Sequence, residues 1–179
     1  MPSTPFVDVN PDEYYYDPVE WATEEEITTG VDDTHFVPDG ICTRAQAVTF
    51  IWRAAGSPQP QTDTTPFQDI HPDDYFYEAV LWATEKGITI GTSETTFSPE
   101  RDCSRAHIVT MLWRDQGKPM AETVIPFEDV DQEAYYAHAV QWAVKNDITT
   151  GTAETTFSPD DACTRAHIVT FLYRALALQ

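Results

Sequence analysis

Residues 42–50 read CTRAQAVTF, and near copies follow as CSRAHIVTM at 103–111 and CTRAHIVTF at 163–171. Each copy begins with a cysteine, continues with a small hydroxyl residue and an arginine, and then becomes largely apolar. Serine and threonine are good helix N-caps. In the first copy Gln46 follows Thr43 by three residues, which is the spacing of a capping box. Each copy therefore predicts the start of a helix, with the arginine at its first position.

The repetition extends over most of the chain. Landmark residues recur after 61 and then 60 positions, at Phe6, Phe67 and Phe127, at Trp21, Trp82 and Trp142, and at Gly30, Gly91 and Gly151. The stretches between the units, SPQPQTDTTP and KPMAETVIP, are rich in proline and polar residues, as connectors usually are. We expect one domain over 1–179 that contains three repeats, at 6–56, 67–117 and 127–179.

Each unit reads as helix, loop, helix. In the second unit the stretch DDYFYEAVLWATEKG offers Asp residues as N-caps and Gly87 as the residue that ends the helix. Apolar residues recur there with helical spacing at Phe76, Ala79, Val80 and Ala83. In the first unit Pro18 would interrupt this helix, so we expect a late start with Asp17 as its cap.

Neither helix of a unit can bury its apolar face alone, so the three units must share one core. They could stack as an open solenoid or close into a pseudo-threefold body. No unit has the character of a capping repeat, which favours closure. The predicted fold class is all-α, with three helix–loop–helix repeats.

The charge and hydropathy of the chain exclude several classes of function. The formal net charge of −20 argues against binding to nucleic acid or to an anionic membrane surface by bulk electrostatics. No apolar run reaches the roughly 18–20 residues of a membrane span. The first residues, MPSTPFVDV, show no signal peptide, so we expect a cytosolic protein or a segment of a processed one.

The three cysteines are interpreted as free thiols. An odd number cannot all pair within the chain, and their identical placement in the repeats is not that of a disulfide framework. A metal site with His107 and His167 is the alternative, but the first unit has Gln46 at that position and no C-x-x-C occurs. A packing role before the helix cap is the simpler explanation.

Six of the ten basic residues occupy equivalent positions, at Arg44, Arg105 and Arg165 and at Arg53, Arg114 and Arg174. Nine residues of helix turn by about 900°, so the two arginines of one helix point to opposite sides. The later arginine suits the helix C-terminus. The earlier one opposes the helix dipole, which leaves two hypotheses, a salt bridge to a nearby Asp or an anion site beside free helix N–H groups.

Aromatic residues gather at the start of the first helix of each unit, among them Tyr14, Tyr75 and Tyr135. Most are expected in the core, although an exposed ring near the arginine could stack on a sugar. No nucleophile elbow, P-loop, zinc-protease or dinucleotide motif occurs, and acids repeated three times do not form one catalytic pair. We therefore expect no enzyme, no cofactor and no metal.

Each unit resembles an S-layer homology motif. The resemblance rests on the starts PFVDV, PFQDI and PFEDV, on the ITTG, ITIG and ITTG stretches, on F-x-P, and on T/S-R-A, in that order. It implies a three-pronged helical domain with one helix of each unit in a central bundle. It also implies a non-catalytic anchor at the bacterial cell surface that binds pyruvylated secondary cell-wall polysaccharide between neighbouring units and works with other envelope domains.

The same resemblance implies the ligand-binding residues. Arg44, Arg105 and Arg165 would pair with the pyruvate carboxylate, Gly30, Gly91 and Gly151 would let the backbone approach the sugar, and Asp8, Asp69 and Asp129 would hold the sugar or shape the groove wall.

Two departures from the motif keep a second hypothesis open, a protein-interaction or surface-assembly module on the same scaffold. The usual glutamate of T-R-A-E is replaced by Gln46, His107 and His167, and the usual P-D-G turn after the glycine reads TSET in the second unit. If the histidines lie near the anion site, their protonation below about pH 6.5 should strengthen anion binding.

Overall fold

The computed structural model describes residues 4–179; Met1–Ser3, where the predicted domain and the segment inspected for a signal peptide begin, lie outside it. Over these residues the chain forms helices and loops, with isolated bridges but no strand. The helices are α1 (Tyr16–Glu24), α2 (Arg44–Ala54), α3 (Tyr77–Glu85), α4 (Arg105–Asp115), α5 (Ala137–Lys145) and α6 (Arg165–Leu176). The prediction of an all-α fold is confirmed.

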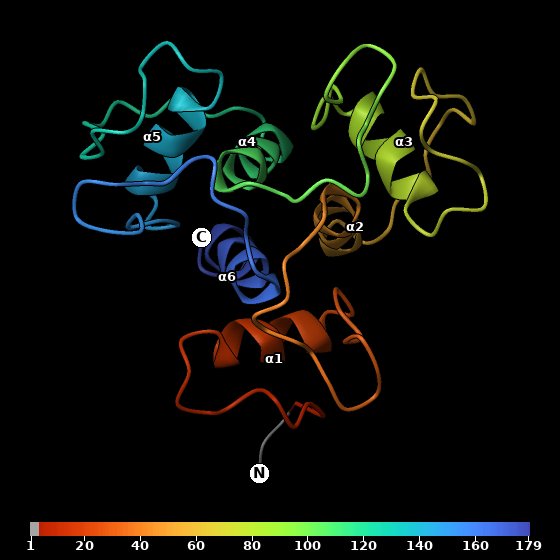
Figure 1. Ribbon diagram of the computed structural model, residues 1–179, viewed down its shortest axis with the longest axis horizontal. Helices are drawn as coiled ribbons and strands as arrows, with labels where there is room; N and C mark the ends of the chain where they lie inside the picture. The colour runs from red at the N-terminus through yellow and green to blue at the C-terminus, as the bar shows by residue number, and fades with distance from the viewer. Residues whose placement is uncertain (1–3) are drawn as a thin grey trace.

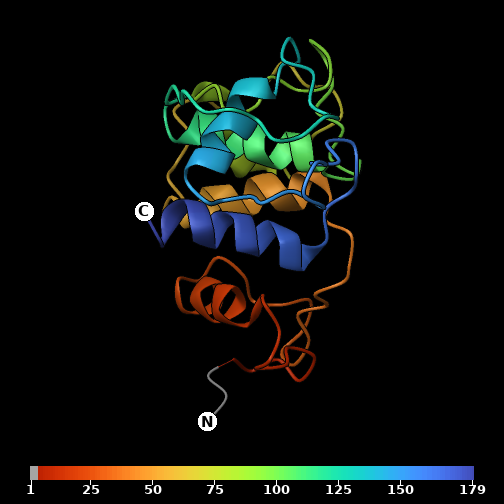
Figure 2. The same cartoon turned by 90° about the vertical axis from the view of Figure 1, so that its left-hand side faces the viewer.

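The second helices of the three units, α2, α4 and α6, form a central bundle in which each contacts the other two. Figure 1 looks along these helices, and Figure 2 shows them from the side. The first helices lie outside as three prongs. Each prong packs on the central helix of another unit: α1 on α6, α3 on α2 and α5 on α4. This exchange closes the three units into a ring, as predicted, rather than an open stack.

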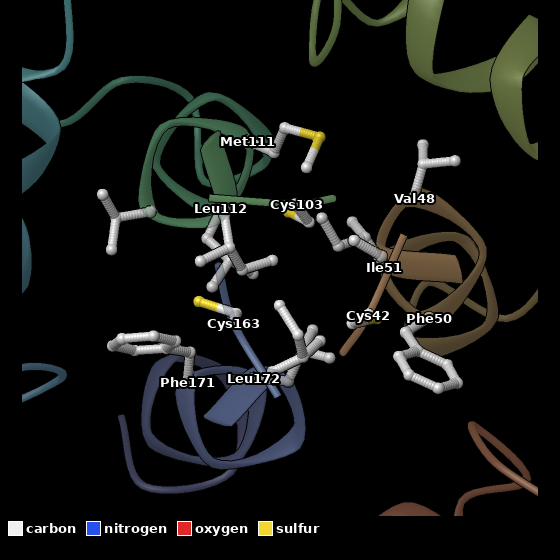
Figure 3. Close-up of a cluster of buried hydrophobic side chains, with 14 of the residues drawn as sticks. Cys42, Val48, Phe50, Ile51, Cys103, Met111, Leu112, Cys163, Phe171 and Leu172 are labelled. Atoms are coloured by element: carbon white, nitrogen blue, oxygen red, sulfur yellow. The ribbon is translucent and has the colours of Figure 1, made fainter. Parts of the chain in front are cut away.

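The cysteines mark the centre of the ring. The backbone N–H of Cys42 donates to the carbonyl of Cys163, that of Cys163 to Cys103, and that of Cys103 to Cys42, over 2.8–2.9 Å. Their buried side chains converge between the central helices with Ile51, Leu112 and Leu172 (Figure 3). These three hydrogen bonds form a closed cycle that requires all three units. Backbone hydrogen bonds therefore link the units into the ring.

The second helices begin where the sequence predicts. Thr43 and Gln46 form the predicted capping box at α2. The same box forms at α4 and α6, where a histidine takes the place of Gln46. The ring nitrogen of a neutral histidine can accept the N-cap N–H as an amide oxygen does.

The starts of the first helices differ from the prediction. The first helix of the second unit, α3, begins at Tyr77 without a side-chain cap. Asp74, the predicted kind of cap, instead accepts the N–H of His71 in a preceding turn. Helix α1 begins at Tyr16, the equivalent position, so Pro18 does not delay it. Pro18 is the third helical residue, where no intrahelical N–H bond is lost. The predicted apolar stripe of α3 is buried.

No helix within residues 4–179 is both long enough and apolar enough to cross a membrane.

Candidate functional site

Three equivalent grooves lie around the central bundle, and each is named here by its glycine. Their cavities measure about 280 Å³ for the Gly91 groove, 390 Å³ for the Gly151 groove and 210 Å³ for the Gly30 groove. The Gly91 groove is lined by Arg44, Thr89, Gly91, Arg101, His107, Thr110, Arg114 and Tyr135, among others. Counterparts of most of these residues line the other two.

Every groove draws on all three repeats. In the Gly91 groove the second repeat supplies the glycine loop and one face of α4, the first repeat supplies Arg44, and the third supplies Tyr135. The Gly151 groove combines Arg105 and Tyr14 in the same way, and the Gly30 groove combines Arg165 and Tyr75. The sites therefore exist only in the closed ring.

The first arginine of each central helix is buried and held by the next repeat in the ring. Arg44 is 4 % exposed, and its Nε donates to the carbonyl of Phe97 over 2.9 Å. Its guanidinium carbon lies 4.8 Å from the centre of the Phe97 ring. Arg105 and Arg165 make the same two contacts, with Phe157 and Phe36. Each of these arginines also lines one groove, Arg44 the Gly91 groove, Arg105 the Gly151 groove and Arg165 the Gly30 groove.

None of these arginines has a carboxylate partner. In the described part of the chain the one ion pair within 4.0 Å joins His35 and Asp32. The salt-bridge hypothesis for the earlier arginine is therefore wrong. Burial lowers the pKa of Arg44, Arg105 and Arg165. Nη2 of Arg165 is buried without a hydrogen-bond acceptor. A buried cation without a counter-ion is costly, and an anion in the groove would remove that cost.

The helix N–H groups are not free, which corrects the second part of the anion hypothesis. The N–H of Arg44 donates to the carbonyl of Arg101, and that of Ala45 to Pro99. The N–H of Gln46 donates to the capping Thr43. The same three bonds form at α4 and α6. An anion in the groove therefore meets side chains rather than a bare helix end.

The later arginine, predicted only to suit the helix end, also lines a groove. Nη1 of Arg114 donates to the carbonyl of Ile88 over 3.2 Å and so holds the loop that leads to Gly91. Arg53 and Arg174 do the same for the other two loops. The two arginines of one helix serve different grooves, in keeping with their predicted opposite directions. The repetition of this residue in a chain with few cations was visible in the sequence, but it was attributed to the helix end rather than to a groove.

The glycines line the grooves, but the fold itself requires them. Gly91 has a φ of +78°, and a Cβ there would lie 2.5 Å from both the Phe67 ring and the carbonyl of Thr96. Gly30 and Gly151 are equally confined by protein atoms. The amide of Gly91 donates to Thr89 in the same groove.

The aspartates lie outside the grooves. Both carboxylate oxygens of Asp69 accept backbone N–H groups, from Phe97 and Ser98, over 2.8 and 2.7 Å. Asp8 and Asp129 make the corresponding bonds. Because the carbonyl of Phe97 in turn accepts from Arg44, Asp69 positions the loop that positions the arginine. This arrangement favours the wall-shaping role over direct contact with a sugar.

Two further kinds of side chain line the grooves. Tyr14, Tyr75 and Tyr135 are exposed rather than in the core, and two of them lie beside histidines, with ring centres 6.4 Å apart for Tyr14 and His167 and 6.5 Å for Tyr135 and His107. Burial, Arg44 and Arg101 lower the pKa of His107 to about 4. For His107 the pH of the expected gain in anion binding is therefore corrected from about 6.5 to about 4 in the unliganded protein, and burial lowers the pKa of His167 in the same direction.

The cysteines take no part in the grooves. Burial raises the pKa of Cys42 and Cys163 to about 12 and raises that of Cys103 well above its usual value, so all three are thiols at neutral pH. Over residues 4–179 no three side chains of the metal-binding types come together.

Comparison with known proteins agrees with this architecture. The model of the S-layer homology domain matches residues 5–48, 66–108 and 126–168. Among similar proteins are an endoglucanase of Bacillus sp. (strain KSM-635), 29% identical over 68% of this chain, a surface-layer 125 kDa protein of Lysinibacillus sphaericus, 30% identical over 59%, and a cell surface protein of Thermoanaerobacter kivui, 28% identical over 64%.

The matched regions are 13%, 9% and 16% of those relatives, so this chain corresponds to a small part of each. The family match itself covers most of the chain and falls on all three repeats. The chain belongs to the S-layer homology domain family, with three tandem repeats closed into one ring.

Proposed function

We propose that this chain is a non-catalytic carbohydrate-binding anchor that tethers a surface protein to secondary cell-wall polysaccharide of a bacterium. The ligand is a pyruvylated amino sugar, and it binds in the grooves between the repeats. The two relatives described as surface-layer and cell surface proteins support this location. The endoglucanase matches over only 13% of its length, which fits an anchoring segment attached to other domains.

The observation that carries the proposal is the buried arginine without a counter-ion in each groove. A guanidinium presents a planar fork of donors that fits a carboxylate in a bidentate manner. The pyruvate ketal supplies such a carboxylate on a sugar ring. An exposed tyrosine in each groove offers a flat apolar face for that ring. The Gly151 groove, at about 390 Å³, falls within the range of small-molecule sites, and the other two are somewhat smaller.

The proposed contacts follow from the groove lining. Arg44, Arg105 and Arg165 bind the carboxylate, and the later arginines, for example Arg114, approach the same group from the other wall. Gly30, Gly91 and Gly151 keep the loop backbone close to the sugar. Asp8, Asp69 and Asp129 act indirectly, through the loop carbonyl that each of the first arginines contacts.

The test is calorimetry of the full chain with purified pyruvylated cell-wall polysaccharide, before and after chemical removal of the pyruvate. We expect removal to lower the affinity by at least about 100-fold, because charge-assisted hydrogen bonds to a buried guanidinium are lost. Unchanged affinity for the depyruvylated polymer would overturn the proposal.

A charge-matched pair of variants tests the residues. Changing Arg44, Arg105 and Arg165 together to Gln should abolish binding, whereas changing the exposed Lys86, Lys118 and Lys145 to Gln removes the same charge outside the grooves and should leave binding intact. Circular dichroism checks folding. If the arginine variant unfolds, the set Arg53, Arg114 and Arg174 to Gln replaces it. A folded domain that binds no saccharide but captures one envelope protein would favour the interaction-module alternative.

A further inference from the structure

The three grooves differ at one position of the turn that follows the F-x-P sequence. This position is Arg101 in the Gly91 groove and Asp161 in the Gly151 groove, and both side chains are exposed and line their groove. The equivalent residue in the first repeat is Gly40, which adds no side-chain charge to the Gly30 groove. The ring is therefore pseudo-symmetric in shape but not in charge.

The Gly91 groove is the most cationic of the three. Arg44, Arg101 and Arg114 line it, and no acidic side chain does. The Gly151 groove has two arginines and the carboxylate of Asp161. Among the residues that the structure describes, Asp161 is the one acid lining any of these grooves. One carboxylate of a ligand that is shared by Arg44 and Arg114 leaves Arg101, the third arginine of the Gly91 groove, without an anionic partner.

A buried hydroxyl provides a second, independent observation. Thr110 lines the Gly91 groove, is 2 % exposed, and its Oγ1 has no hydrogen-bond partner. The equivalent Thr49 and Thr170 each donate to the carbonyl four residues earlier, over 2.7 Å. An unpaired buried hydroxyl is costly unless a ligand or water satisfies it. Thr110 therefore leaves an unpaired hydroxyl beside the Gly91 groove, which its two counterparts do not.

The histidine of this groove adds another donor. Nδ1 of His107 accepts the N–H of Ser104 in the capping box, so in the neutral ring the proton resides on Nε2. A carboxylate at this position, as in the usual T-R-A-E motif, could only accept. With three arginines, one free hydroxyl and this imidazole, the Gly91 groove presents hydrogen-bond donors to its ligand.

We propose that the Gly91 groove binds a saccharide segment with two acidic groups, one on Arg44 and Arg114 and the second on Arg101, and that Asp161 makes the Gly151 groove reject the second group. The inference rests on the proposed function, since it assumes that the grooves bind acidic sugar. It makes Arg101 and Asp161 the residues that determine which segment of the polymer each groove accepts.

The experiment compares two disaccharides of pyruvylated N-acetylmannosamine, one with glucuronic acid and one with glucose. Each is titrated into the isotope-labelled full chain, and the amide signals of Gly30, Gly91 and Gly151 report on the three grooves separately. We expect the Gly91 groove to prefer the diacid by about tenfold, the effect of one charge-assisted hydrogen bond pair. The Gly151 groove should prefer the monoacid.

Two exposed substitutions test the assignment without touching the buried arginines. Arg101→Gln should abolish the preference for the diacid in the Gly91 groove, and Asp161→Arg should create it in the Gly151 groove. Lys86→Gln, which removes the same charge as Arg101→Gln but outside the grooves, should alter neither preference. If all grooves bind both disaccharides equally, this inference is wrong while the proposed function stands. If the folded domain binds neither disaccharide, the proposed function itself fails.

Discussion

At the scale of single residues, the chain keeps cations buried in a body of strongly negative net charge. Thirty acidic residues are present, yet Arg44, Arg105 and Arg165 are buried and none of them forms an ion pair within 4.0 Å. Aromatic rings and backbone carbonyls hold each guanidinium instead, which compensates only part of the desolvation cost. The three arginines whose burial carries this desolvation cost are therefore also the residues best placed to bind an anion.

His107 leads to a prediction about how the free energy of unfolding depends on pH. Its pKa in the folded protein is about 4, against a usual value of 6.5, because of burial and the nearby Arg44 and Arg101. Between these values the unfolded chain binds a proton that the folded chain does not, so the free energy of unfolding falls as the pH drops from about 6.5 to about 4. His107→Gln should reduce this fall, since Gln46 forms the same capping box in the first repeat.

Urea unfolding at pH 4.5, 5.5, 6.5 and 7.5, the range set by these pKa values, measures the effect. The carboxylates titrate equally in both proteins and cancel in the comparison. The exposed His71, changed to Gln, serves as the control outside the grooves and should keep the wild-type profile. Identical profiles for His107→Gln and the wild type would contradict the prediction.

At the scale of the elements, the three outer helices end in the same turn with different residues. After α1, α3 and α5 the N–H of Ile27, Ile88 and Ile148 donates back to Ala22, Ala83 and Ala143, as in a Schellman motif. The left-handed position of this turn holds Gly87 in the second repeat, at a φ of +68°. Glu26 and Asp147 adopt the same conformation at +57° and +56°. Non-glycine residues are strained in this region.

Glu26→Gly and Asp147→Gly should therefore each raise the free energy of unfolding by about 0.5–1 kcal/mol, the strain relieved less the added entropy of the unfolded chain. Both side chains are exposed, so no packing is lost. Gly87→Ala is the reciprocal control. A Cβ there would meet open space, so only backbone strain would lower its stability. The measurement is the midpoint of urea unfolding of each variant against that of the wild type. A lower midpoint for Glu26→Gly and Asp147→Gly would contradict the predicted stabilisation.

At the scale of the whole molecule, the repeats are interlocked rather than stacked. Each outer helix packs on the central helix of another repeat, and the cysteine backbones bond in a cycle. Removing one repeat opens the cycle and exposes the apolar faces of the other two. An open solenoid, in contrast, can lose a repeat and keep the remainder folded.

We therefore expect the full chain to unfold in one transition, with calorimetric and van't Hoff enthalpies in agreement. The peptide 6–56 and the fragment lacking residues 127–179 should show no cooperative unfolding by circular dichroism. A cooperatively folded two-repeat fragment would contradict the interlocked ring. The full chain at the same concentration and pH is the reference.

Local signals in the sequence determined the helices, the loops and the repetition. The T/S-R-A starts are correct to the residue because a capping box is satisfied within four residues of chain. The first helix of the second repeat begins later than predicted because Asp74 closes a turn instead of capping a helix, whereas α1 begins earlier than predicted, at Tyr16. Short-range hydrogen bonds compete there, and the sequence favours neither of them strongly.

Tertiary structure alone decided which repeats share a groove and what the arginines contact. The partners of Arg44 are 53 residues away at Phe97, and those of Arg165 are 129 residues away at Phe36, so no local pattern reveals them. The same is true of Arg114, Tyr135 and Arg101, which become groove residues only when three repeats meet. Repetition by itself determined that the units were equivalent. Closing the ring placed each arginine, buried and without a counter-ion, beside a cavity.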